Sequence, residues 1–201
     1  MRIFRILGIL TVSMLLCSCA GQQQAPSLEQ QKHAGVSRIE GASIETVRKE
    51  PKVASGYDNI VLNPVLVSPQ VAQDYPSTAN ELLVSFLSQL KNKNTYKHVA
   101  EFDAGSRTYA GKTLIVDIEV VDMRIVSENA RIWAGPMAGA SYMDVYLKLT
   151  DASTKKVVHE KVITTNNNAF ASSWAIGSEN SLPMDMGKIV GEYLSTVVSA
   201  K

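Results

Sequence analysis

The chain has 201 residues, 45% of them hydrophobic, and its 20 Lys and Arg residues almost balance its 19 Asp and Glu residues. This length suffices for one domain with a sizeable core. The near-neutral balance excludes the basic face that nucleic-acid binding requires, so we expect no nucleic-acid partner.

Residues 1–18 have the features of a bacterial lipoprotein signal peptide. Arg2 and Arg5 precede an apolar run over residues 7–16, which is shorter than the roughly 20 residues that span a bilayer. Cys19 follows Leu-Cys-Ser, which resembles the Leu-x-small-Cys pattern of the lipobox. We therefore predict cleavage before Cys19 and attachment of acyl chains, such as palmitate, to this residue.

Only Cys19 has suitable residues before it, because bulky Met14, Leu15 and Leu16 precede Cys17. Cys17 would leave with the signal, so the mature chain would contain no free thiol. Ala20 stands where retention in the inner membrane usually places Asp. The sequence therefore predicts an outer-membrane lipoprotein that faces the periplasm and contacts the membrane through its lipid.

Residues 19–55 are polar and rich in Gln, and Pro51 interrupts them. Such a segment cannot bury enough apolar surface to offset its ordering entropy. We predict a lipidated flexible tether over residues 19–55, in which His33 is solvated, and a single globular domain over residues 56–201. A strand or short helix within residues 39–47 is left open.

The predicted domain begins with a strand over residues 57–67 that breaks at Asn63-Pro64. A helix follows over residues 78–93, because Leu82, Leu83, Phe86, Leu87 and Leu90 recur at helical spacing. A short strand at residues 96–102 precedes an alternating strand at 112–126, whose phase slips near Val121 as at a β-bulge.

A hairpin comes next, with strands at residues 141–150 and 157–165 around a turn at 151–156. A polar loop at residues 166–181 leads to a helix at 182–201, whose apolar side carries Met186, Ile189, Val190, Tyr193, Leu194 and Val197. Consecutive strands with short connections favour an α+β fold. We predict a two-layer sandwich in which two helices cover a mixed or antiparallel sheet of about five strands.

The charged residues do not form a recognisable reaction centre. Strand alternation places Asp117 and Glu119 on one outward polar face, which explains them without a catalytic role. His33, His98 and His159 are scattered and lie at no metal-ligand spacing. We therefore predict no catalytic residue, metal or cofactor, and expect that the protein is not an enzyme.

Residues 114–154 join an aliphatic strand, an Arg-aromatic pair, a Gly-rich run and a strand that leads into Asp151-Ala152-x-Thr154. The pair is Arg131 and Trp133, and Gly135, Gly139 and Ala140 follow in the Gly-rich run. This pattern resembles a family of bacterial lipoproteins catalogued as domain of unknown function 4410, and the similarity covers about residues 57–201. Lys155 stands where that family usually has Gly. The resemblance implies a secreted, lipid-anchored domain with no assigned chemistry.

The Gly-rich segment is the candidate functional site. It is either a mobile or folded-back loop between strands or an interaction surface, with Arg131, Trp133, Gly135, Met137 and Gly139 as its residues. The preferred function is a non-catalytic interaction or assembly factor of the cell envelope, with other envelope proteins or further copies of this chain as partners. The alternative is a carrier of a small ligand or lipid, with a groove between sheet and helices as its binding site.

Overall fold

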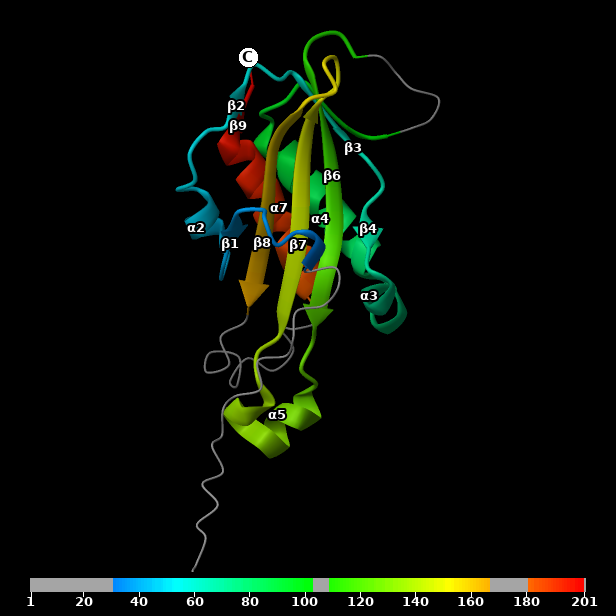
Figure 1. Cartoon of the computed structure of the whole chain (residues 1–201), viewed down its shortest axis with the longest axis vertical. Coiled ribbons are helices and arrows are strands. Elements are labelled where there is room, and N and C mark those ends of the chain that lie inside the picture. The colour runs from blue at the N-terminus through cyan, green and yellow to red at the C-terminus, as the bar shows by residue number, and fades with distance from the viewer. Residues whose placement is uncertain (1–30, 103–108, 167–180, 201) are drawn as a thin grey trace, which may run out of the picture.

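The computed structural model describes residues 31–102, 109–166 and 181–200 (Figure 1). A seven-stranded sheet forms one layer, and two long helices, α4 (Thr78–Lys93) and α7 (Leu182–Val197), lie together on one face of it. The strands of the sheet are β1 (Arg38–Ile39), β3 (Asn59–Leu62), β4 (Leu66–Val67), β5 (His98–Glu101), β6 (Thr113–Arg124), β7 (Tyr142–Asp151) and β8 (Val157–Asn166).

The sheet has the order β1-β8-β7-β6-β3-β5, and β4 also pairs with β6. β6, β7 and β8 form an antiparallel meander, whereas β3 pairs in parallel with β5 and β6, and β1 pairs in parallel with β8. The fold is therefore the two-layer α+β sandwich with a mixed sheet that the sequence predicts. The smaller elements are β2 (Ala54–Ser55), β9 (Val198–Ser199), α2 (Ile44–Val47), α3 (Pro69–Asp74), α5 (Glu128–Ala134) and the 3-10 helix η1 (Gly135–Ala138).

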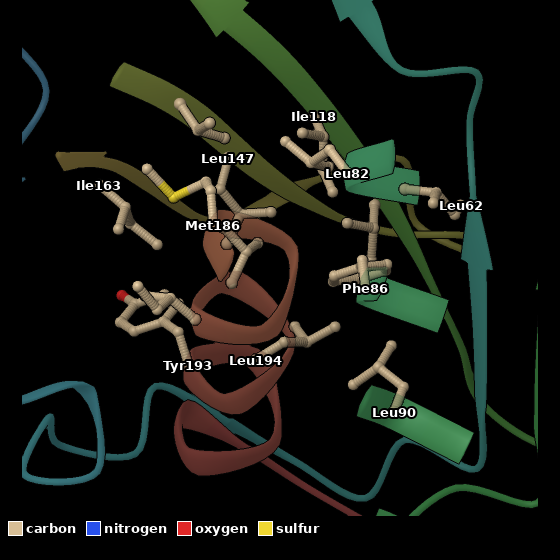
Figure 2. Close-up of a cluster of buried hydrophobic side chains, with 14 of the residues drawn as sticks. Leu62, Leu82, Phe86, Leu90, Ile118, Leu147, Ile163, Met186, Tyr193 and Leu194 are labelled. Carbon is tan, nitrogen blue, oxygen red and sulfur yellow. The ribbon is translucent and has the colours of Figure 1, made fainter. Parts of the chain in front are cut away.

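The core lies between the sheet and the two long helices (Figure 2). The buried side chains of the helices include Leu82, Phe86, Leu90, Met186, Tyr193 and Leu194, and those of the sheet include Leu62, Ile118, Leu147 and Ile163. Alternate residues of β6 are buried, as expected for a strand that faces helices on one side only. The register shifts between Val120 and Asp122, which confirms the predicted bulge.

The N-terminal boundary predicted for the domain is wrong. Residues 31–55, here called the N-terminal strap, pack against the sheet and helices: β1 pairs with β8, β2 pairs with β9, and Val47 of α2 is fully buried. His33 is 7% exposed and its ring stacks on Tyr146 at 3.9 Å between centroids, so it is not solvated. The strap lacks a periodic pattern because each short piece of it packs against a different distant part of the chain.

Residues 1–30, which include Cys19 and part of the predicted tether, lie outside the described residues. Among the helices of the described ranges, none combines the length and the apolar character that crossing a membrane requires.

Candidate interaction surface

The connection between β6 and β7 extends beyond the end of the sheet, where α5 and η1 lie (Figure 1). All five residues of the predicted site are in this connection, with Arg131 and Trp133 in α5 and Gly135 and Met137 in η1. Pro136 has no backbone N–H and cannot continue an α-helix, so α5 ends just before the Gly135-Pro136 pair. The segment is helical and is not a loop folded back between strands.

Hydrogen bonds fix the base of this connection to the end of the sheet. The backbone N–H of Val126 donates to Ser141 Oγ at 3.0 Å, and Arg124 Nη2 donates to the carbonyl oxygen of Ala138 at 3.2 Å. Gly139 has φ +85°, a left-handed conformation that L side chains rarely adopt. The glycine is therefore required by the turn that returns the chain to β7.

Three large apolar side chains project from this connection into solvent. Met137 is 93% exposed, Trp133 is 88% exposed and Ile132 is 67% exposed. We call Ile132, Trp133 and Met137 the α5 surface. Clustered exposed apolar side chains mark contact sites more often than isolated ones do. Sequence reasoning missed Ile132, although the signal was present, because an aliphatic residue directly before Trp133 increases the apolar area of the same short segment.

The predicted acidic pair has a structural role. Asp117 Oδ2 lies 3.2 Å from Lys148 Nζ, and Asp117 Oδ1 accepts a hydrogen bond from Asn63. Glu119 forms an ion pair with Lys32 of the strap at 2.9 Å. Both carboxylates therefore lie on the outward face of the sheet, as predicted. There they form ion pairs with lysine side chains, and the pair of Glu119 with Lys32 helps to hold the strap.

The Asp151-Ala152-x-Thr154 motif also has a structural role. Asp151 Oδ1 accepts hydrogen bonds from Ser153 and Thr154, and these bonds lower the pKa of Asp151 well below its usual range. Tyr57 donates to Asp151 Oδ2 at 3.0 Å, and burial together with this bond raises the pKa of Tyr57 to about 12. The motif thus shapes the turn between β7 and β8 and attaches it to Tyr57, just before β3.

The groove predicted between sheet and helices is filled by core side chains in the described part of the chain. Hollows lie instead on the surface, one of about 340 Å³ beside Val84 and Met184 on the outside of α4 and α7, and one of about 280 Å³ beside Phe102. In the same described ranges, no group of three or more His, Cys, Asp and Glu residues could hold a metal ion.

The family described as "Domain of unknown function (DUF4410)" matches residues 36–171. The chain belongs to this family. The match begins inside the strap, in agreement with a folded unit that includes it. No curated protein matches the sequence.

Three solved structures are similar to this chain. The PelC dodecamer from Paraburkholderia phytofirmans has a TM-score of 0.50 and 13% identity, covering 76% of this chain and 95% of that chain. Lipoprotein GNA1162 from Neisseria meningitidis has a TM-score of 0.37 and 13% identity, covering 67% and 96%. The hypothetical protein CT253 from Chlamydia trachomatis has a TM-score of 0.41 and 13% identity, covering 69% and 94%. At these identities the likeness concerns the fold alone.

Proposed function

We propose that this protein is an outer-membrane-anchored lipoprotein that faces the periplasm and acts by binding, as an assembly or accessory factor of the cell envelope. The α5 surface is the observation that carries the proposal. It exposes Ile132, Trp133 and Met137 at one end of the molecule, although exposed apolar area of this kind is costly in water. Tryptophan in particular is enriched among residues that dominate binding energy.

The geometry of the connection supports a contact role. Its base is tied to β6 and β7, the longest strands of the sheet together with β8, so the α5 surface is held at a fixed place. A preorganised surface loses less entropy on binding than a flexible one does. The lipobox match at Cys19 supports the envelope location.

The partners in this proposal are other envelope proteins or further copies of this chain, together with the membrane to which the lipid on Cys19 would anchor it. Self-association is supported by the dodecamer that PelC, a protein with a similar fold, forms. The carrier alternative has no comparable support, because core side chains fill the space between sheet and helices in the described ranges.

Photo-crosslinking in cells tests the proposal. A photoreactive amino acid placed at position 137 should form covalent adducts with neighbouring proteins or lipids. The same amino acid at position 157 should not form these adducts. Val157 is a suitable control, because it is also exposed and begins β8 beside the β7–β8 turn, away from α5 (Figure 1). Equal adduct patterns at the two positions, for proteins and for lipids alike, would contradict a contact role of the α5 surface.

Trp133→Ala supplies the functional arm of the test. We expect it to reduce the adducts formed from position 137 while it changes the free energy of unfolding by no more than about 0.5 kcal/mol, as is usual for exposed sites. A loss of about 3–5 kcal/mol, typical of aromatic residues in a packed core, would show that Trp133 is structural. Thermal unfolding of the purified variant distinguishes the two results.

A further inference from the structure

We propose that the α5 surface rests in the interfacial region of the membrane leaflet that holds the lipid on Cys19. The inference rests on the proposed function, because it names the occupant of that contact surface. It leaves the sides of the sheet and the outer face of α4 and α7 to protein partners. Three observations carry it: the place where the described chain begins, the small size of the surface, and its residue types.

The described chain begins beside the middle of β6. Lys32 pairs with Glu119, and the neighbouring His33 stacks on Tyr146. Glu119 precedes the last residue of β6, Arg124, by five positions, which is about 17 Å along a strand. The chain from Cys19 to Lys32 reaches at most about 45 Å when fully extended. The lipid therefore holds the domain close enough to the leaflet for the α5 surface to touch it.

The correction of the domain boundary strengthens this point. A tether ending at residue 55 would allow the domain to stand far from the membrane and to rotate freely. The strap instead fixes residues 31–55 to the sheet, so that at most the residues between Cys19 and Gln31 separate the folded part from the lipid. A short connection keeps the domain close to the bilayer.

The α5 surface is too small for a stable protein interface by itself. Three side chains of this size offer on the order of 400–500 Å² of surface. A standard protein–protein interface buries about 800 Å² on each partner. A membrane contact needs no such area, because the acyl chains on Cys19 supply the affinity and the α5 surface only has to orient the domain.

The residue types fit the interfacial region of a bilayer. Tryptophan is enriched at this depth, because its ring is apolar and its indole N–H can bond to headgroups. Ile132 and Met137 can enter the apolar layer beside Trp133 without bringing a buried polar group with them. These preferences favour a lipid contact for the α5 surface.

The opposite end of the sheet offers a competing orientation. It carries Lys112, Lys155 and Lys156 around the β7–β8 turn, and cationic side chains are attracted to anionic headgroups. A test must therefore measure both ends of the molecule. Val157, exposed beside that turn, provides the position for a second probe.

Tryptophan fluorescence of the lipidated full-length protein in vesicles of phosphatidylethanolamine and phosphatidylglycerol makes this measurement. Trp174→Phe leaves Trp133 as the sole tryptophan, and a second variant combines Trp133→Phe and Trp174→Phe with Val157→Trp. We expect brominated acyl chains to quench Trp133 and shift its emission to the blue. The tryptophan at position 157 should show neither effect.

Met137→Cys, labelled with a polarity-sensitive fluorophore, gives a second readout that is independent of the tryptophan substitutions. Quenching at position 157 without quenching at Trp133 would overturn the inference in favour of the opposite orientation. Absence of quenching at both ends, with a water-exposed signal from position 137, would also overturn it. In that case protein adducts from position 137 in cells would still uphold the proposed function, whereas their absence would remove both.

Discussion

Glu192 of α7 keeps a negative charge although only 2% of the residue is exposed. Its Oε1 accepts hydrogen bonds from Arg48 at 2.6 Å and Lys93 at 2.7 Å, and its Oε2 accepts one from Gln89 at 2.7 Å. Burial alone would raise the pKa of Glu192, but the bonds from these three residues outweigh it and lower the pKa. This one carboxylate joins the strap, α4 and α7.

Glu192→Gln should lower the free energy of unfolding at neutral pH by about 1.5–3 kcal/mol, the contribution typical of hydrogen bonds to charged groups. Because the folded-state pKa of Glu192 is lowered, its stabilising contribution is present above the unfolded pKa of about 4.5 and is lost as the pH falls through the folded value. Denaturant unfolding of both proteins between pH 7 and pH 3 measures this.

The difference between wild type and Glu192→Gln should therefore shrink as the pH falls below about 4.5. Glu45→Gln is the control, because Glu45 is exposed on α2 and its loss should change stability by no more than about 0.5 kcal/mol. A difference that stays constant from pH 7 to pH 3 would contradict the role assigned to the charge of Glu192.

Lys155 has φ 58° in the turn between β7 and β8. The left-handed conformation costs a residue with a Cβ about 1–2 kcal/mol, partly offset by the greater freedom of Gly in the unfolded chain. Lys155→Gly should therefore raise the free energy of unfolding by about 0.5–1 kcal/mol. Lys156→Gly, at a position without positive φ, should lower it. Equal effects of the two changes on thermal unfolding would argue against conformational strain at Lys155.

At the scale of elements, α4 and α7 approach each other closely at Gly187 and Gly191. A Cβ at Gly187 would lie 2.5 Å from the carbonyl oxygen of Leu82, and one at Gly191 would lie 2.9 Å from Cβ of Gln89. The backbone of Leu82 belongs to a packed helix and cannot move without disturbing the core. These two glycines set the distance between the helices that cover the sheet.

Gly187→Ala should lower the free energy of unfolding by about 1–3 kcal/mol, as overpacking does, despite the better helix propensity of Ala. Gly35→Ala is the matched control, because a Cβ at Gly35 would meet no atom within 4 Å and the φ of this residue is not positive. Chemical denaturation compares the two. Similar stabilities of both variants would show that α4 and α7 can separate at little cost.

The elements with a clear period were predictable, and those without one were not. Apolar spacing located α4 and α7, and strand alternation located β6 to β8 together with the bulge near Val121. In the strap, β1 and β2 contain two residues each, and they form because β8 and β9 offer free edges. A single stretch of sequence cannot show such distant partners. The same limit applied to α5, a helix of seven residues that the sequence did not predict.

The candidate site was predictable in its place but not in its exposure. The Arg-aromatic pair and the glycines located the connection, yet the sequence alone left a loop between strands and an interaction surface open for this segment. The exposure of Trp133 depends on where the connection lies, because α5 has no opposing layer to pack against beyond the end of the sheet (Figure 1). That position is a property of the assembled sheet.

At the scale of the whole molecule, the strap belongs to the folded unit. A chain that starts at Tyr57, the boundary predicted from sequence, should be less stable than one that starts at Gln31 by at least about 3 kcal/mol, since burial of each Val or Ile side chain contributes about 1.5–3 kcal/mol. The truncation removes buried Val47 and the ion pairs of Arg38 with Asp144 and of Arg48 with Glu192. Thermal unfolding of the two chains measures the difference.

Val47→Ala in the longer chain is the companion variant, because it removes buried apolar atoms of the strap without removing backbone. It should cost about 2 kcal/mol. Identical melting temperatures for all three chains would show that the strap lies on the domain without stabilising it, and would restore a boundary near Tyr57.

The strap also has a consequence for the rate of folding. Its contacts join residues far apart in the chain, such as Arg38 with Thr164 over 126 positions and Arg48 with Glu192 over 144 positions. Non-local contacts slow folding, because the entropy of closing a long loop is lost before the contact forms. The first residues of the folded unit can therefore form their contacts only after residues near the end of the chain have taken their places. Until β1 has paired with β8 and α7 has formed beside α2, the edge of β8 and the buried face of α2 stay open to other chains, and during this interval a newly made molecule is most exposed to aggregation.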